Sequence, residues 1–97
     1  MAWLKEGGSF ISHEEADAMI DRYQQASPGT IKSIYFDKAK ILRLLDRVTA
    51  EGVSVFFAKN EDGSNTVALK AIDGEGNILK DVAVLEVGTP CPPYCPK

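Results

Sequence analysis

Residues that carry out chemistry are scarce in this chain. Histidine occurs once, as His13, and cysteine occurs twice, as Cys91 and Cys95. A lone histidine forms no acid–base pair, because a general base needs a second group to orient it, and Glu14 and Glu15 are only sequence neighbours. We therefore interpret His13 as a solvated residue at the start of a helix. We expect no catalytic residue and no enzymatic activity.

The chain also lacks a strong excess of charge and a long apolar run. Its net charge is −3, which provides no positive field for a phosphate backbone, so we expect no nucleic-acid partner. No segment approaches the roughly 20 apolar residues of a membrane span or the roughly 7–15 of a signal peptide. We expect a cytoplasmic protein with no membrane partner, in which a reducing environment keeps both cysteines as thiols.

Two acidic, glycine-containing segments, NEDGSN and DGEGN, do not fit a ligand-binding loop. With Gly63 at the sixth position of a calcium loop, Ala58 and Leu69 fall at positions that must supply oxygen ligands. Gly74 and Gly76 precede no helix whose first turn would hold a phosphate. We interpret both segments as hairpin turns, and we expect no cofactor.

Two amphipathic helices are predicted. Ser12 can cap the first, over residues 12–26, and Glu15 completes a capping box. Asp37 can cap the second, over residues 38–50, with Gly52 beyond its end in the left-handed conformation that favours glycine. Each helix has one apolar stripe. The stripes are Ala16, Met19, Ile20 and Tyr23 in the first helix, and Ile41, Leu42, Leu44, Leu45 and Val48 in the second.

Four strands are predicted from short β-branched and aromatic segments that turn residues separate. The last three, joined by short turns, are typical of an antiparallel meander. The order α-β-α-β-β-β predicts an α+β fold in which two helices pack on one face of a four-stranded, largely antiparallel sheet. The predicted strands cover residues 31–36, 53–58, 66–72 and 78–87.

The second face of this sheet is predicted to be apolar as well. A sheet face in contact with water would show a cleaner alternation of polar and apolar residues. We therefore predict that the chain associates with itself as a twofold dimer through this face. If it is a monomer, the C-terminal tail, or Trp3 and Leu4, would cover the face instead. The face carries Phe56, Ile72, Leu85 and Val87.

The C-terminal segment, TPCPPYCPK, is the chemically unusual part of the chain. Its prolines restrict the backbone, and in a polyproline II helix Cys91 and Cys95 would stand about 12 Å apart. A disulfide needs Cα atoms within about 7 Å. The pair can bridge, or share a metal ion, only if Pro92, Pro93 and Tyr94 turn back. We divide the chain into a lead-in segment at 1–10, one domain at 11–88 and a tail at 89–97.

Four interpretations of this tail remain open. In the simplest, Tyr94 and the prolines pack against the domain and both thiols are idle. Alternatively, Cys91 and Cys95 share Zn²⁺ or Cu(I) with ligands from a second chain, form a redox pair despite a spacing that differs from C-x-x-C, or ligate haem.

We favour a non-enzymatic interaction or accessory protein in which Pro92, Pro93 and Tyr94 contact a protein partner. The alternative is a thiol redox protein, or a soft-metal-binding protein, that uses Cys91 and Cys95. We expect an ordered tail with Tyr94 at least partly buried. We also expect the fold to survive removal of residues 89–97.

Four segments taken together carry a resemblance: ISHEEADAMIDRY, KSIYFDKAKILRLL, GVSVFFA and GTPCPPYCP. In these the chain resembles a family of small hypothetical proteins from Bacteroidetes that end in a Cys-Pro-Pro-x-Cys-Pro tail. The resemblance covers nearly all of the sequence after residue 10. It implies a bacterial single-domain protein whose tail is a family trait, and it implies no catalytic or binding residue.

Overall fold

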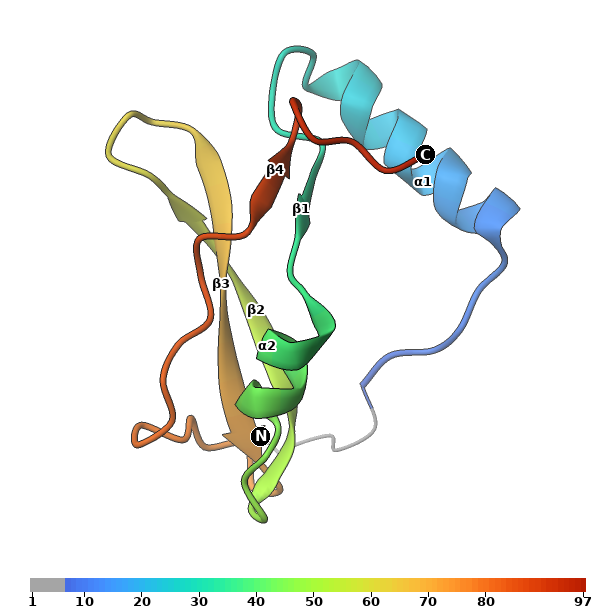
Figure 1. Cartoon of the computed structure of the whole chain (residues 1–97). Coiled ribbons are helices and arrows are strands. Elements are labelled where there is room, and N and C mark those ends of the chain that lie inside the picture. The colour runs from blue at the N-terminus through green and yellow to red at the C-terminus, as the bar shows by residue number, and fades with distance from the viewer. Residues whose placement is uncertain (1–6) are drawn as a thin grey trace.

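The computed structural model describes residues 7–97, which form two helices and four strands arranged in two small antiparallel sheets (Figure 1). One sheet pairs β2 with β3 and the other pairs β1 with β4. The mixed α and β content is as predicted, but the single four-stranded sheet is not. The elements are α1 His13–Ala26, β1 Ser33–Tyr35, α2 Lys38–Leu44, β2 Ala50–Lys59, β3 Asn65–Asp73 and β4 Thr89–Cys91.

The β2–β3 hairpin is the longest regular part of the described chain. Its register places Val55 opposite Leu69 and Phe57 opposite Val67. The strands run slightly beyond the predicted segments at both ends, and the β-branched and aromatic residues at their centres suit a pleated surface. Gly63 has a φ of +89° in the connecting turn, a conformation that glycine adopts without a steric cost. The hairpin is therefore specified by its own sequence.

The strand predicted over residues 78–87 does not form. Only two isolated bridges join this segment to β3, Leu69 to Leu85 and Ile72 to Ile78, and the residues between them leave the ladder. The Val82 N–H donates to the carbonyl of Leu79 at 3.2 Å, which turns the chain away from β3. Some apolar side chains of this segment are thus buried by packing on the core, although the backbone of the segment does not pair with β3 as a strand.

The core lies between α2, the hairpin and the chain that follows it. Leu44 of α2 is buried together with Leu69 and Ala71 of β3. Burial of such side chains stabilises the fold by about 1.5–3 kcal/mol each for the larger residues. Six partly buried residues pack around them: Phe36, Ala50, Val67, Leu79, Val82 and Leu85.

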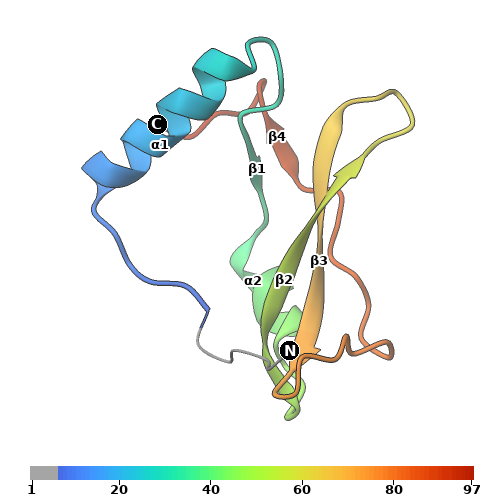
Figure 2. The same cartoon turned by 180° about the vertical axis from the view of Figure 1, so that it is seen from behind.

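Helix α1 does not belong to this core. The Ser12 hydroxyl oxygen accepts a hydrogen bond from the Glu15 N–H at 3.1 Å, which confirms the predicted N-cap. The helix buries none of its residues, however, and Met19, the most exposed of the predicted stripe's large side chains, is 57% exposed. Figure 2 shows α1 on the far side of β1 and β4 from the hairpin. The prediction that both helices cover the sheet is wrong for α1.

Helix α2 is shorter than predicted. The Asp37 carboxylate accepts from the Lys40 N–H at 2.8 Å, which confirms this cap, but the helix ends at Leu44 instead of residue 50. Val48 is fully exposed, and Gly52 lies inside β2 without a positive φ. The β-branched Val48 and its neighbour Thr49 lose side-chain freedom in a helix, and β2 begins directly after them.

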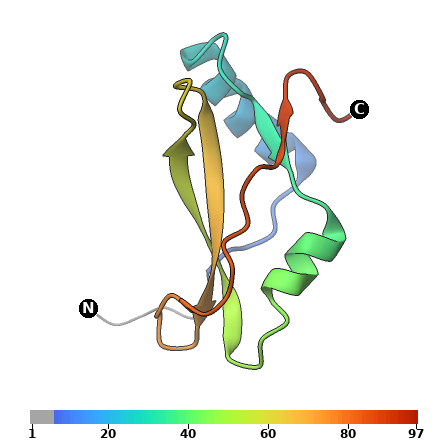
Figure 3. The same ribbon diagram turned by 60° about the vertical axis from the view of Figure 1, so that its left-hand side comes forward.

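Strand β4 begins where the tail was predicted. It pairs with β1, with Ser33 opposite Cys91, Ile34 opposite Pro90 and Tyr35 opposite Thr89 (Figure 3). Removing residues 89–97 would therefore also remove β4. The expectation that the fold survives this deletion loses its basis, because the deleted segment includes one of the two strands of a sheet.

The apolar second face predicted for the sheet is not continuous. Ile72 is 5% exposed and Leu85 is partly buried against the core, so Ile72 offers almost no surface to another chain and Leu85 only part of its side chain. Phe56 and Val87 remain exposed, at 40% and 85%. The alternative cover by Trp3 and Leu4 lies outside the described residues. Within residues 7–97, no helix has the length and apolar character that a membrane crossing requires.

Candidate functional site

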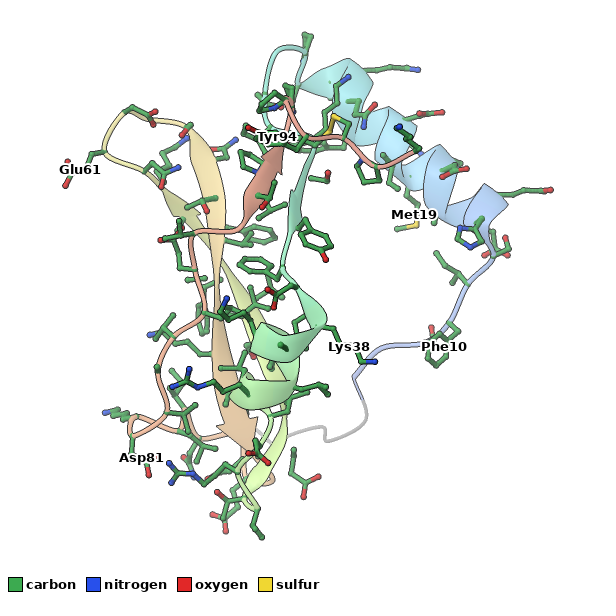
Figure 4. All side chains as sticks on the ribbon, viewed as in Figure 1. Phe10, Met19, Lys38, Glu61, Asp81 and Tyr94 are labelled. Carbon is green, nitrogen blue, oxygen red and sulfur yellow. A yellow bond between two sulfur atoms is a disulfide. The ribbon has the colours of Figure 1, made fainter. Side chains whose placement is uncertain are left out.

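The end of the chain closes into a small ring, residues 91–95, which we call the C-terminal ring. A disulfide joins Cys91 to Cys95, whose Cα atoms are 4.6 Å apart (Figure 4). The Tyr94 N–H donates to the carbonyl of Pro90 at 3.1 Å, so the chain turns back as a bridge requires. Both peptide bonds that precede Pro92 and Pro93 are cis.

Strands β1 and β4 position the ring. Cys91 is the last residue of β4, opposite Ser33, and its carbonyl accepts a hydrogen bond from the Lys32 N–H at 2.6 Å. The Cys91 side chain is only 4% exposed, whereas Cys95 is exposed. One end of the ring is thus held in the fold, and the other end faces solvent.

The ring displays the three residues that the sequence assigned to a partner. Pro92, Pro93 and Tyr94 are all exposed. Tyr94 is 68% exposed, so the prediction that it is at least partly buried against the domain is wrong. The physical reason is the turn itself, because the Tyr94 N–H bonds back to Pro90 and Cys95 bonds back to Cys91, which leaves Tyr94 on the exposed part of the ring. An exposed aromatic side chain on a closed ring is suited to contact another molecule.

The sulfur atoms are bonded to each other, and a disulfide offers no thiolate to a metal ion. Among residues 7–97, no group of three or more histidine, cysteine or acidic side chains could hold one. Metal binding by Cys91 and Cys95 therefore stays a prediction for the reduced protein, with further ligands from a second chain. That the cysteines are reduced in the cell also stays a prediction. His13 is exposed at the first residue of α1, in agreement with a solvated side chain.

A groove of about 540 Å³ lies between β1 and the hairpin, and no pattern in the sequence predicted it. Ile34 of β1 and Phe57 and Val67 of the hairpin supply most of its apolar lining, and Tyr23 reaches it from α1. No acidic, histidine or cysteine side chain lines it. The groove combines this apolar surface with the polar side chains of Lys32, Ser33 and Thr66. No periodic pattern could have predicted it, because its walls come from three separate elements.

A second groove, of about 520 Å³, is charged. Lys40, Arg43 and Arg47 of α2 and the turn after it face the loop that holds Asp81. Arg47 forms an ion pair with Asp81, and its side-chain hydrogen bond is the main cause that lowers the pKa of this carboxyl. The charges of this groove are thus partly compensated within the chain.

The remaining carboxylates with shifted pKa values serve the turns. The side-chain hydrogen bond from Ser64 is the main cause that lowers the pKa of Asp62. The backbone N–H of Asn77, at 2.9 Å, has the same effect on Asp73. Both carboxylates accept hydrogen bonds within the segments NEDGSN and DGEGN. NEDGSN is thus a hairpin turn, as predicted, whereas DGEGN is a turn that is followed by one isolated bridge, Ile72 to Ile78, and not by a second strand.

No protein-family model, curated protein or solved structure matches this chain. The resemblance to small Bacteroidetes proteins therefore remains a prediction.

Proposed function

We propose that the chain is a non-enzymatic interaction protein that presents its C-terminal ring to a protein partner. The observation that carries the proposal is the 68% exposure of Tyr94 on a ring closed by a disulfide and held by β4. A segment already fixed in shape loses little conformational entropy on binding, so more of its contact energy becomes affinity. Tyrosine is among the residues that most often dominate the energy of an interface.

The ring suggests the chemistry of the partner's surface. Pro92 and Pro93 offer apolar rings without backbone donors, and Tyr94 offers an aromatic face with a hydroxyl at its tip. A shallow pocket lined by aromatic side chains, with one hydrogen-bond acceptor at its base, would complement this set. The proposed partner is therefore a protein with an aromatic-lined groove.

Affinity capture with a matched control tests the proposal. The full chain, the Tyr94→Ala variant and a Tyr35→Ala variant would each be immobilised under oxidising conditions. Tyr35 is 61% exposed on β1, so its loss removes a comparable amount of aromatic surface outside the ring. We expect a protein captured by the full chain and by Tyr35→Ala to be lost with Tyr94→Ala. Capture that is unchanged by Tyr94→Ala would refute the role of the ring.

The redox state of the compartment decides whether the Cys91–Cys95 disulfide, and therefore the ring, is closed. In a reducing cytoplasm, which the sequence predicts, glutathione would open the ring and release Cys95. We propose that the closed ring is the binding form, which departs from the predicted reducing cytoplasm and requires a compartment in which the disulfide persists. The same capture carried out with a reductant should therefore recover less of the partner. Equal recovery in both conditions would mean that closure of the ring is not needed for binding.

A second candidate function is thiol–disulfide exchange, and one observation favours it. The disulfide joins a buried sulfur, that of Cys91, to an exposed one, that of Cys95. An incoming dithiol in its thiolate form would attack Cys95 Sγ, and the electron pair of the broken S–S bond would leave on Cys91 Sγ, which takes up a proton. The second thiol of the dithiol then releases Cys95 as a thiol and leaves the dithiol oxidised.

The reduction potential separates the two functions. A potential above roughly −230 mV is in the range of glutaredoxins and protein disulfide isomerase and would support exchange. A potential below roughly −300 mV is typical of structural disulfides and would leave the ring as a binding element. Equilibration with glutathione buffers, read by mass after thiol blocking, measures this quantity.

A further inference from the structure

The outer edge of β2 has unpaired backbone groups, and the bonding of β3 shows which residues carry them. Leu69 of β3 donates to the carbonyl of Leu85 at 2.8 Å and accepts from the Leu85 N–H at 3.0 Å. Both backbone groups of Leu69 therefore point away from β2. In an antiparallel ladder, two residues that lie opposite each other either both bond across the ladder or both point away from it. The residue opposite Leu69 therefore directs its N–H and C=O away from β3, toward the outer edge of β2. That residue is Val55.

The same alternation extends along the strand. The carbonyl of Ala71 accepts from the Leu79 N–H at 3.0 Å, so Val53, which lies opposite Ala71, also faces outward. Phe57 follows by the period of two residues. Among residues 7–97, no backbone hydrogen bond outside the β2–β3 ladder involves Val53, Val55 or Phe57. Their N–H and C=O groups form an open hydrogen-bonding edge.

The side chains of these residues form an apolar row on one face beside that edge. Val53 is 37% exposed, Val55 51% and Phe57 93%. A long, exposed and apolar edge is the kind of surface that accepts another strand. The opposite edge of this sheet is different, because the bridges to Ile78 and Leu85 occupy part of it. Figure 3 shows β3 between β2 and the chain that leads to β4.

We propose that β2 pairs antiparallel with β2 of a second copy of this chain, with Val55 on the twofold axis. In this register Val55 faces the partner's Val55, and Val53 faces the partner's Phe57. Glu51 lies near the partner's Lys59 at the end of the seam, where a β-bulge between Ala50 and Gly52 interrupts the regular register. Val53, Val55 and Phe57 then exchange hydrogen bonds with the partner strand, and the apolar rows of the two copies continue across the seam.

The sequence of β2 is the reason for choosing a second copy as the occupant. Within β2, Glu51 lies four residues before Val55 and Lys59 lies four residues after it. Antiparallel pairing about Val55 therefore brings opposite charges near each other at both ends of the seam, where Lys59 would exchange its 2.7 Å hydrogen bond to Asn65 Oδ1 for the partner's acidic side chain. The far edge of β3 is already bonded in part to the chain that follows it, so a further copy cannot pair along its length. Pairing through β2 alone gives a closed dimer instead of an open fibre. This inference is independent of the ring.

Charge substitutions on the proposed axis test the register. A lysine at position 55 would face its own copy, so Val55→Lys should be monomeric, and Val55→Glu should be monomeric for the same reason. An equimolar mixture of the two variants should restore the dimer, because unlike charges then meet. The matched control is Val84→Lys, since Val84 is 50% exposed in the segment on the other side of β3.

Sedimentation velocity at high micromolar concentration gives the mass, with circular dichroism to verify folding. We expect the full chain and Val84→Lys to sediment at twice the 10.5 kDa of the chain, each Val55 variant at 10.5 kDa, and the mixture again at twice this mass. A monomeric full chain, a dimeric Val55→Lys, or a mixture that stays monomeric would each overturn the proposal. A Val84→Lys monomer would overturn it too.

Hydrogen exchange on the unaltered chain supplies a test that needs no variant. The amides of Val53, Val55 and Phe57 should exchange quickly at low protein concentration. Their exchange should become at least tenfold slower as the protein concentration, and with it the dimeric fraction, rises. The amides of Ser54 and Phe56 bond to β3 and should be protected at every concentration. Protection at Val53, Val55 and Phe57 that does not change with concentration would refute strand pairing between copies.

Discussion

Gly88 is the position where a single methyl group should do most damage to the support of the ring. A Cβ added there would overlap the Ile34 side chain and would lie 2.8 Å from the carbonyl oxygen of Tyr35 and 2.9 Å from the Phe36 ring. Carbon atoms in favourable contact are about 3.5–4.0 Å apart. The Tyr35 oxygen is a backbone atom of β1, so it cannot move aside as the end of a flexible side chain could.

The Gly88→Ala variant should therefore force β4 away from β1. Overpacking of this kind costs about 1–3 kcal/mol, and a loss of 2 kcal/mol lowers the melting temperature of a chain of this size by roughly 8–16 °C. Gly52→Ala is the matched control, because nothing lies within 4 Å of a Cβ at Gly52. It should change stability by less than about 0.5 kcal/mol.

Thermal and urea unfolding of the three proteins at low micromolar concentration measure these differences. We also expect the Lys32 amide, which donates to Cys91, to exchange faster in Gly88→Ala because β4 has shifted. A Gly88→Ala protein as stable as Gly52→Ala would show that β1 and β4 do not approach as closely as described and do not hold the ring rigidly.

Two further predictions concern the backbone next to β4 and the turn after β3. Val87 has a φ of +62°, where a β-branched residue is strained, so Val87→Gly should be neutral or stabilising by up to about 1 kcal/mol in urea unfolding; a clear destabilisation would argue against this conformation. The pKa of Asp73 is held below the ordinary 3.8, chiefly by the hydrogen bond from the Asn77 N–H. The ionised carboxylate therefore stabilises the fold above pH 3.8, and this stabilisation is lost as the pH falls through the lower pKa of the folded state. Asp73→Ala should therefore lower the urea midpoint at pH 7, and this difference from the unaltered chain should shrink well below pH 3.8; a difference that is constant with pH would contradict the assignment.

The sequence by itself determined the features that depend on neighbouring residues. Ser12 and Asp37 were predicted as caps, and both accept the hydrogen bonds that define a cap. The β2–β3 hairpin and its turn were predicted from alternation and turn residues, and they form. Hydrogen bonds over three or four residues, and pairing across a short turn, close without help from distant parts of the chain.

The candidate site was determined in part. The sequence identified Cys91, Cys95 and the residues between them, and it showed that a bridge requires the chain to turn back. It could not show that the turn forms, or that Tyr94 points to solvent, because both depend on where β4 places the start of the ring. The pairing of β4 with β1 joins segments far apart in the sequence, and a three-residue strand that contains a proline has no periodic signal.

Tertiary structure also decided which apolar stripes became core. Met19 and its neighbours on α1 have the same helical spacing as the stripe of α2, yet only Leu44 of α2 is buried between the hairpin and the chain that follows it. Periodicity specifies which face of a helix is apolar but not what that face meets. The segment over residues 78–87 shows the same limit, since its apolar residues could pair with β3 or pack on the core. Over most of this segment the apolar residues pack on the core, and the loop that carries Asp81 interrupts the pairing with β3. Burial of apolar area has no preferred direction, whereas a strand ladder needs an uninterrupted register.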